Sequence, residues 1–206
     1  MKRDKPYSDL HSYFPYRVCI NLDRRPERWS RMREIFLQHK VTPVERFAAI
    51  DGLELNVPAH SQISRGAYGC LLSHVEIIKR ARERRLPTVL IFEDDCCFDP
   101  DFNNKFSYHI KQLPSDWDMF LLGGMHLEEP TMVTTGIARL RSTCLLHAYA
   151  LNQTIYDAFI ELCEPAQEPI DMYTLMLQEK FNCYGVVPDL IWQAWDMGFE
   201  SDIPEE

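Results

Sequence analysis

Three consecutive carboxylates, Glu93-Asp94-Asp95, are the residues of this chain best placed to do chemistry. They follow the apolar, β-branched run 87–92, which predicts a buried strand. Open α/β sheets bind ligands at the carboxyl ends of their strands. Adjacent negative charges raise one another's pKa unless a cation offsets them, and Mg²⁺ or Mn²⁺ with oxygen ligands suits that role. The triplet is therefore a candidate site for a divalent metal and a diphosphate; an acidic turn at the surface is the alternative.

A cluster of arginines is the second candidate feature. The net charge of the chain is −9 at pH 7, which argues against a general nucleic-acid binder because phosphate contacts need a basic surface. In contrast to this negative net charge, five arginines lie within ten residues, just after the first expected strand: Arg24, Arg25, Arg28, Arg31 and Arg33. A position at the start of a helix suits an anionic ligand. A solvated helix face is the alternative.

Length and composition limit the remaining choices. The chain has 206 residues, which is enough for one domain with a sizeable core. Its seven cysteines have no paired spacing, so we expect reduced thiols and a cytoplasmic setting. No apolar run reaches the length of a membrane span, and no apolar stretch follows the basic N-terminus, so we expect neither a span nor a signal peptide. The oligomeric state is left open.

The elements that must position these residues follow from the apolar pattern. Strands that alternate with helices predict an α/β fold with a central, mostly parallel sheet flanked by helices. Residues 1–15 have no period and are expected to form an N-terminal arm, followed by a single domain over 16–206. Asp23 is the expected N-cap of the first helix, with Pro26 in its first turn. Strands are expected over 16–22, 44–50, 87–92, 117–122, 145–151 and 184–187, and helices over about 24–40, 65–85, 153–163 and 170–181.

Four separated motifs together resemble one family. They are Ile20–Arg28, Arg46–Gly52, Gly66–His74 and Val89–Asp95, in this order. In this combination they resemble glycosyltransferase family 25, the lipooligosaccharide-type galactosyltransferases related to collagen hydroxylysine galactosyltransferases. Two further segments resemble weaker, distal motifs of the family: Pro169–Asp171, and Gln193 together with Ser201–Ile203. The resemblance therefore spans residues 16–203.

The resemblance implies a GT-A-like nucleotide-sugar-binding fold and a hexosyltransferase. The expected reaction moves galactose or glucose from a UDP-sugar donor, with inversion, to a saccharide or hydroxylysine-containing acceptor, with Mn²⁺ or Mg²⁺ as cofactor. Asp95 is the expected direct metal ligand, because a bound cation offsets the charge that develops on the leaving diphosphate. Related enzymes commonly add a late histidine, but none follows His147, so Asp202, Gln193 or water is expected in its place.

The remaining acids are assigned by their place around the donor. Glu93 and Asp94 are expected to hold the ribose hydroxyls or the water shell of the metal. Inverting transfer needs a base on the far face of the sugar, and Asp171, at a helix start after Pro169, is the candidate catalytic residue. The alternative for Asp171 is a helix-terminal acid that is favoured by the helix dipole.

The first strand-to-helix turn supplies the expected nucleotide rim. Asn21, Arg24 and Arg28 lie on that turn, and Ala49 and Asp51 are expected beside the uracil, where Asp51 could accept its N3–H. A simple turn-forming role is the alternative for Asp51.

The helix over 65–85 supplies further substrate-binding candidates. Ser73 and His74 lie just inside it and are candidates for diphosphate contacts, although His74 shares the apolar stripe and could be a core histidine. Gly69 would allow the backbone to approach a ligand or the sheet closely.

Two other classes share the acid cluster. A metal-dependent nucleotidyltransferase or phosphohydrolase would need a glycine-rich phosphate loop or a second ligand cluster, and neither is evident in the sequence. A non-catalytic relative would bind a sugar nucleotide without transferring the sugar.

Overall fold

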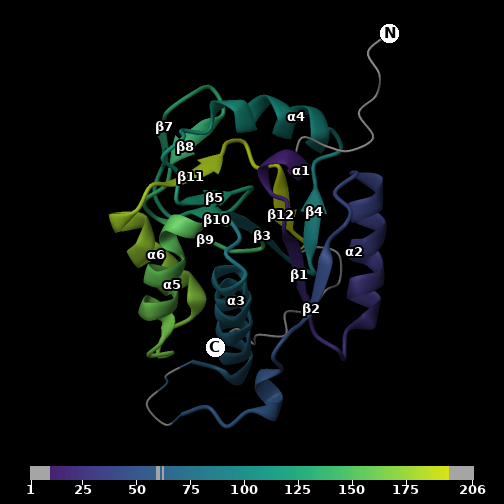
Figure 1. Cartoon of the computed structure of the whole chain (residues 1–206), viewed down its shortest axis with the longest axis vertical. Coiled ribbons are helices and arrows are strands. Elements are labelled where there is room, and N and C mark those ends of the chain that lie inside the picture. Colours follow the sequence, from purple (N-terminus) through teal and green to yellow (C-terminus); the bar gives the residue numbers. More distant parts are fainter. Residues whose placement is uncertain (1–9, 59–60, 62, 195–206) are drawn as a thin grey trace.

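A computed structural model describes residues 10–58, 61 and 63–194. Its centre is an eight-stranded sheet with the order β2-β1-β3-β10-β5-β11-β8-β7 (Figure 1). β2, β1, β3, β5, β11 and β7 run in one direction, whereas β10 and β8 run in the opposite one. The strands in spatial order are β2 (Glu45–Ala48), β1 (Arg17–Asn21), β3 (Thr88–Glu93), β10 (Ala148–Asn152), β5 (Met119–Leu121), β11 (Cys183–Val186), β8 (Ile137–Arg139) and β7 (Thr131–Met132). The predicted α/β class with a mostly parallel sheet is confirmed.

Helices cover both faces of this sheet, as the apolar run of β3 requires. Side chains alternate along a strand, so Val89 and Ile91 enter one core while Leu90 and Phe92 enter the other. The first core is covered by α3 (Arg65–Glu83), α5 (Tyr156–Cys163) and α6 (Ile170–Lys180). The second is covered by α1 (Leu10–Tyr13), α2 (Pro26–Gln38) and α4 (Phe102–His109). The result is a three-layer arrangement, with α3, α5 and α6 grouped together in Figure 1.

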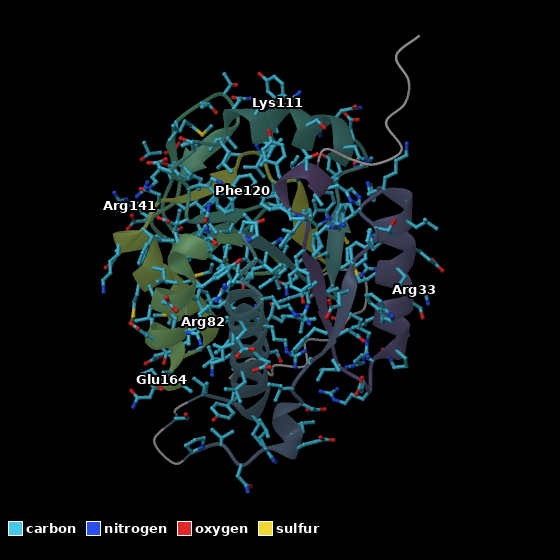
Figure 2. All side chains as sticks on the ribbon, viewed as in Figure 1. Arg33, Arg82, Lys111, Phe120, Arg141 and Glu164 are labelled. Atoms are coloured by element: carbon cyan, nitrogen blue, oxygen red, sulfur yellow. The ribbon has the colours of Figure 1, made fainter. Side chains whose placement is uncertain are left out.

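The surface and the interior of the molecule are separated by residue type. In Figure 2 the side chains of Arg33, Arg82, Lys111 and Arg141 extend outward from the ribbon. Phe120 of β5 lies in the interior and is 1% exposed. Arg33 therefore belongs to a solvated face, the alternative stated above for the arginine cluster. None of the helices among the described residues is long and apolar enough to cross a membrane.

Two local predictions at the N-terminal side are corrected. The expected arm over 1–15 contains α1 from Leu10 on, and both Leu10 and Phe14 are fully buried, so these residues are part of the core. The N-cap of α2 is Arg25, without a side-chain cap, rather than Asp23. Asp23 instead accepts a hydrogen bond from Arg46 at 2.6 Å. A helix of one turn has too few residues to show a period, which is why the sequence pattern missed α1.

Several short elements were not predicted, and one pair of them matters for function. β4 (Cys96–Phe98) pairs in antiparallel fashion with β12 (Ile191–Gln193). The backbone N–H of Ala194 then donates to Asp95 O at 2.9 Å. This ribbon brings the end of the described chain beside the acidic triplet. The other unpredicted elements are α4, β7, β8, β6 (Met125–His126), β9 (Thr143–Cys144) and the 3₁₀ turns η1 (Gly52–Glu54), η2 (Ile110–Gln112) and η3 (Gln153–Ile155).

Candidate active site

A cleft opens where β1, β2 and β3 end, between the β1–α2 turn, the loop after β2, the N-terminal half of α3 and β12. This is the edge at which ligands bind in open α/β sheets. The predicted site residues that line the cleft are Asn21, Arg24, Arg28, Ala49, Asp51, Ser73, His74, Glu93, Asp94, Asp95 and Gln193. Gly69 and Asp171 do not line it, and Asp202 lies outside the described residues.

Asp95 has the most unusual electrostatic environment in the cleft. Burial, followed by the charges of Glu93 and Asp94, raises its pKa to about 7, although a hydrogen bond from Gln193 acts against this rise. That bond runs from Gln193 Nε2 to Asp95 Oδ2 at 2.8 Å. The other oxygen, Asp95 Oδ1, is buried without a hydrogen-bond partner among the described residues, as is Gln193 Oε1. Two unpartnered oxygens beside like charges fit a hard divalent cation.

Glu93 is the first member of a hydrogen-bonded chain that runs through His74 to Tyr149. Glu93 Oε1 lies 3.2 Å from His74 Nε2, and His74 Nδ1 lies 2.8 Å from the hydroxyl of Tyr149. Burial acts to raise the pKa of Glu93, but the hydrogen bond and charge of His74, with His147 and Arg28, outweigh it and lower that pKa. His74 is fully buried and also lines the cleft. The two alternatives for this histidine, core residue and site residue, therefore both apply.

Asp94 connects β3 to the β1–α2 turn. Asp94 Oδ2 accepts from Asn21 Nδ2 at 2.6 Å, and Asp94 Oδ1 accepts from Arg28 Nη1 at 3.2 Å. Burial raises the pKa of Asp94 in spite of these two donors. Both carboxylate oxygens thus have protein partners, and Arg28 is buried in the same contact. Asp94 and Arg28 hold the turn in place; a ribose contact by Asp94 stays a prediction.

Arg46 extends this network and was not singled out from the sequence. Its Nε donates to Asn21 Oδ1 at 2.8 Å, while Asn21 Nδ2 also donates to Arg25 O at 2.9 Å. Every polar atom of the Asn21 side chain is therefore bonded to protein. Arg46 opens the second family-like motif, which is the signal that could have drawn attention to it. Asn21 therefore ties the β1–α2 turn to β2 and to the end of β3.

Arg24 and Asp51 face each other across the cleft mouth. Arg24 Nε donates to Asp51 Oδ2 at 2.8 Å, and the Arg24 side chain is 37% exposed. Asp51 Oδ1 accepts from Leu53 N at 3.0 Å and so caps η1. The turn-forming role considered for Asp51 is therefore observed; its contact with uracil stays a prediction. Ala49 lies beside this pair in the cleft lining.

Gly69 and Ser73 hold the loop after β2 against α3. A Cβ atom on Gly69 would lie 2.5 Å from both Gly52 N and Ile50 O, so the two segments pack at backbone distance. Ser73 Oγ accepts from Ile50 N at 2.8 Å and donates to Gly69 O at 2.7 Å. The close approach expected at Gly69 exists, but it is to the loop and not to the cleft. Ser73 is fully buried in the same contact.

Asp171 lies in the first turn of α6, outside the cleft lining. Its Oδ1 accepts from Leu145 N at 2.9 Å. Burial raises the pKa of Asp171, the Leu145 hydrogen bond lowers it, and the charge of Glu93 raises it further. Asp171 is thus held by a backbone contact outside the cleft, and its role as a base stays a prediction.

Cys70 is a second residue, besides Arg46, that the sequence pattern missed at this site. It lines the cleft one turn before His74 on α3, and its Sγ lies within 4.8 Å of ligand atoms of both His74 and Glu93. The i, i+4 spacing of a cysteine and a histidine on one helix is the signal that could have found it.

Comparisons with known proteins agree with this geometry. A family model described as glycosyltransferase family 25 (LPS biosynthesis protein) matches residues 15–174. A glycosyltransferase 25 family member of Drosophila pseudoobscura pseudoobscura is 35% identical over 129 residues, which cover 53% of this chain and 20% of that protein. Procollagen galactosyltransferase 2 of Homo sapiens is 30% identical over 143 residues, covering 59% of this chain and 23% of that protein. The chain thus spans about a fifth of the length of these relatives.

Similarity to solved structures is weaker. The apo crystal structure of mouse xyloside xylosyltransferase 1 has a TM-score of 0.39 and 8% sequence identity, covering 79% of this chain and 68% of that one. No functional argument rests on this likeness. The family model is stronger evidence than these structures, because it matches residues 15–174, which are most of the chain and include all four motifs that line the cleft. The chain belongs to glycosyltransferase family 25.

Proposed function

We propose that this chain is a metal-dependent, inverting glycosyltransferase. It moves a hexose, galactose or glucose, from a UDP-sugar to a hydroxyl of a saccharide or hydroxylysine-containing acceptor. Family membership supports sugar transfer, and the relative named procollagen galactosyltransferase 2 supports the choice of hexose and acceptor. The observation that carries the proposal is the charge-crowded carboxylate of Asp95, whose Oδ1 is buried without a hydrogen-bond partner among the described residues, in a cleft that also holds two arginines.

The cation site is built from oxygen atoms. Asp95 Oδ1 and the side-chain oxygen of Gln193, Oε1, would hold Mn²⁺ or Mg²⁺, because both atoms are buried without a hydrogen-bond partner among the described residues. Glu93, which also lines the cleft, would lie beside them. When bound, the cation supplies Lewis-acid charge for the leaving diphosphate. Its presence would also lower the pKa of Asp95 to the range in which the carboxylate is fully ionised.

The donor-binding contribution comes from the β1–α2 turn and the loop after β2. Arg24 is the arginine whose guanidinium reaches the open side of the cleft, and it is placed to pair with the diphosphate. Asn21, Asp94 and Arg28 keep that turn in position. Ala49 and Asp51 line the same side, where the uracil would lie.

The acceptor-side chemistry is assigned to Asp171. The acceptor oxygen attacks the anomeric carbon, the bond to UDP breaks, the electron pair leaves with UDP, and the acceptor proton passes to Asp171. A carboxyl whose pKa is raised by burial is a better base near neutral pH than an exposed one. Asp171 comes from the first turn of α6, a different element from the β1–α2 turn and the loop after β2, which form the proposed nucleotide rim.

Release of UDP from a panel of UDP-sugars, with Mn²⁺ or with EDTA, tests the proposal. We expect turnover of UDP-galactose or UDP-glucose only with the metal, and slow donor hydrolysis without an acceptor. Asp95→Asn should abolish this metal-dependent release of UDP. Glu76→Gln, which removes a half-exposed carboxylate paired with Arg80 on α3, is the matched control and should leave it unchanged.

Several outcomes would contradict the proposal. UDP binding without release from any sugar would make the chain a non-catalytic relative. Release of inorganic phosphate, or nucleotidyl transfer from a nucleoside triphosphate, would place it in the second enzyme class. Full activity of Asp95→Asn with Mn²⁺ would overturn the metal assignment.

A further inference from the structure

Cys70, His74 and Glu93 form a ligand cluster whose atoms differ from the Asp95 and Gln193 oxygens assigned to the catalytic cation. Cys70 and His74 lie one turn apart on the same face of α3, and Glu93 ends the neighbouring strand β3. The thiol sulfur, an imidazole nitrogen and a carboxylate oxygen all lie within 4.8 Å of one another. Within the part of the chain that the structure describes, no other three such ligands meet this closely.

The spacing of these atoms is close to that of a tetrahedral site. Bonds of about 2.0 Å to nitrogen and oxygen and about 2.3 Å to sulfur place the ligand atoms roughly 3.3–3.7 Å apart. His74 Nε2 and Glu93 Oε1 already lie 3.2 Å apart. Cys70 Sγ lies within 4.8 Å of the ligand atoms of both His74 and Glu93, which makes it the third ligand of the site.

Tyr149 provides the outer contact that such a histidine needs. His74 Nδ1 lies 2.8 Å from the Tyr149 hydroxyl, and the two rings stack with centroids 5.6 Å apart. Both side chains are fully buried, so the imidazole keeps one orientation. Metal-bound histidines commonly donate their second ring N–H to such an acceptor, which directs the other nitrogen at the metal. Here that nitrogen is Nε2, the one that faces Glu93.

We propose that Cys70, His74 and Glu93 bind a zinc ion inside the donor cleft. A thiolate with an imidazole selects zinc over Mg²⁺ or Mn²⁺, which prefer the oxygens of Asp95 and Gln193. All three ligands line the cleft, so the fourth coordination position faces the space where the donor binds. Burial and the neighbouring carboxylates raise the pKa of Cys70 well above its usual value, and a bound cation reverses that effect.

Zinc at this position should inhibit sugar transfer, a consequence that rests on the proposed function. The ion would engage Glu93 and place two positive charges beside the Asp95 site, which opposes binding of the catalytic cation. Its open position faces the donor, so zinc would also compete with the diphosphate for the same space. The enzyme would then be active with Mn²⁺ and inhibited by zinc.

Titration of the full chain with Co²⁺, a spectroscopic substitute for zinc, tests binding without any need for activity. We expect one equivalent to produce a thiolate-to-cobalt charge-transfer band that zinc displaces. Cys70→Ser should lose the band. Cys144→Ser removes another half-buried free thiol, on β9, and should keep it. Tyr149→Phe should retain the thiolate ligand but weaken affinity by about 10–100-fold.

The outcomes separate this inference from the proposed function. A band that survives Cys70→Ser in a variant of unchanged melting temperature, or no zinc binding at all, would overturn the site. The second readout is zinc inhibition of Mn²⁺-dependent UDP release, which Cys70→Ser should weaken by about tenfold or more. If the chain transfers no sugar but Cys70→Ser abolishes the cobalt band, the zinc site stands and the proposed function does not. If the chain transfers sugar but the band does not depend on Cys70, only the zinc site is overturned.

Discussion

Asp95 and Asp94 are adjacent acids whose environments differ, and the difference assigns their roles. Asp94 has a hydrogen-bond donor for each oxygen, whereas Asp95 Oδ1 is buried without one among the described residues. An uncompensated carboxylate next to two others is unstable in its charged form. We therefore assign Asp95, the acid with one buried oxygen lacking a hydrogen-bond partner among the described residues, to the cation.

This assignment predicts a pH dependence of stability. Without a cation the folded-state pKa of Asp95 is about 7, against about 4 in the unfolded chain. Between these values the folded chain holds a proton that the unfolded chain lacks. The free energy of unfolding should therefore fall, through this group, as pH rises from about 4 to about 7.

Thermal unfolding at about pH 5 and about pH 8, with and without Mn²⁺, measures this dependence. Mn²⁺ should raise the melting temperature chiefly at the higher pH, because it stabilises the ionised carboxylate. Asp95→Asn should raise the metal-free melting temperature at the higher pH and remove the gain from Mn²⁺. An equal gain from Mn²⁺ in the variant would show that the ion binds elsewhere.

Arg24 and Arg28 are expected to separate into a ligand-binding and a structural residue. The side chain of Arg28 is 7% exposed and pairs with Asp94, while that of Arg24 is 37% exposed at the cleft mouth. Arg24→Ala should weaken UDP binding by about 1.5–3 kcal/mol with little change in unfolding. Arg28→Ala should lower the free energy of unfolding by about 3 kcal/mol, because Asp94 is left buried without a counter-charge.

Calorimetry with UDP and Mn²⁺, together with urea unfolding, distinguishes the two variants. The sequence alone predicted an affinity role for both arginines, and only the burial of Arg28 separates them. Unchanged UDP affinity in Arg24→Ala would return Arg24 to a solvated helix face.

At the scale of elements, the N-terminal half of α3 is the support on which the loop after β2 rests. Gly69 allows α3 to approach Gly52 at backbone distance, and Ser73 adds two hydrogen bonds to the same contact. The loop carries Ala49 and Asp51, which line the cleft on the side where we propose that the nucleotide binds. We therefore expect the packing of α3 to set the width of the cleft.

Gly69→Ala should therefore lower both stability and UDP affinity. Its Cβ would lie 2.5 Å from backbone atoms that cannot rotate away, and overpacking of this kind typically costs about 1–3 kcal/mol. Gly185→Ala on β11 is the matched control, since its Cβ would meet only the Leu140 side chain, at 3.0 Å or more. Urea unfolding and UDP calorimetry of both variants test this; normal UDP affinity in Gly69→Ala would show that α3 does not set the cleft.

For the whole molecule, the proposed base and most of the proposed donor site come from different halves of the chain, and Gln193 of β12 is the cleft residue that comes from the second half. The nucleotide rim and acidic triplet come from residues before 96, whereas Asp171 is supplied by α6, which packs with α5 and α3 on one face of the sheet. The sheet joins the halves through the antiparallel pairing of β10 with β3. This separation predicts that chemistry and donor binding can be impaired independently.

Asp171→Asn should lower transfer by ~10²–10⁴ with little change in UDP-sugar affinity or melting temperature. Asparagine keeps an oxygen for the Leu145 N–H but cannot accept the acceptor proton. Asp157→Asn, an exposed acid on α5 that pairs with Arg82, is the control and should leave transfer normal. Loss of donor affinity in Asp171→Asn would instead place Asp171 on the sugar hydroxyls, and normal transfer would eliminate it as the base.

The sequence by itself determined the elements and the order of the motifs. The predicted strands over 16–22 and 87–92 correspond to β1 and β3, and the helix over 65–85 corresponds to α3. Long apolar runs and helical periods are local signals, so each can be detected without knowledge of its partners. The acidic triplet could be placed at a strand end, and most of the cleft lining could be listed, for the same reason.

Only the tertiary structure decided which side chains have partners. Asn21 and Asp94 are 73 positions apart, and Gln193 and Asp95 are 98 positions apart, yet each pair is hydrogen-bonded. β12, which brings Gln193 to the triplet, is too short to show a period, and Cys70 meets Glu93 only because α3 packs on β3. Such contacts depend on how distant elements pack, and local preferences do not encode this. Identical residue types in one motif therefore acquired different roles through burial and hydrogen bonding alone.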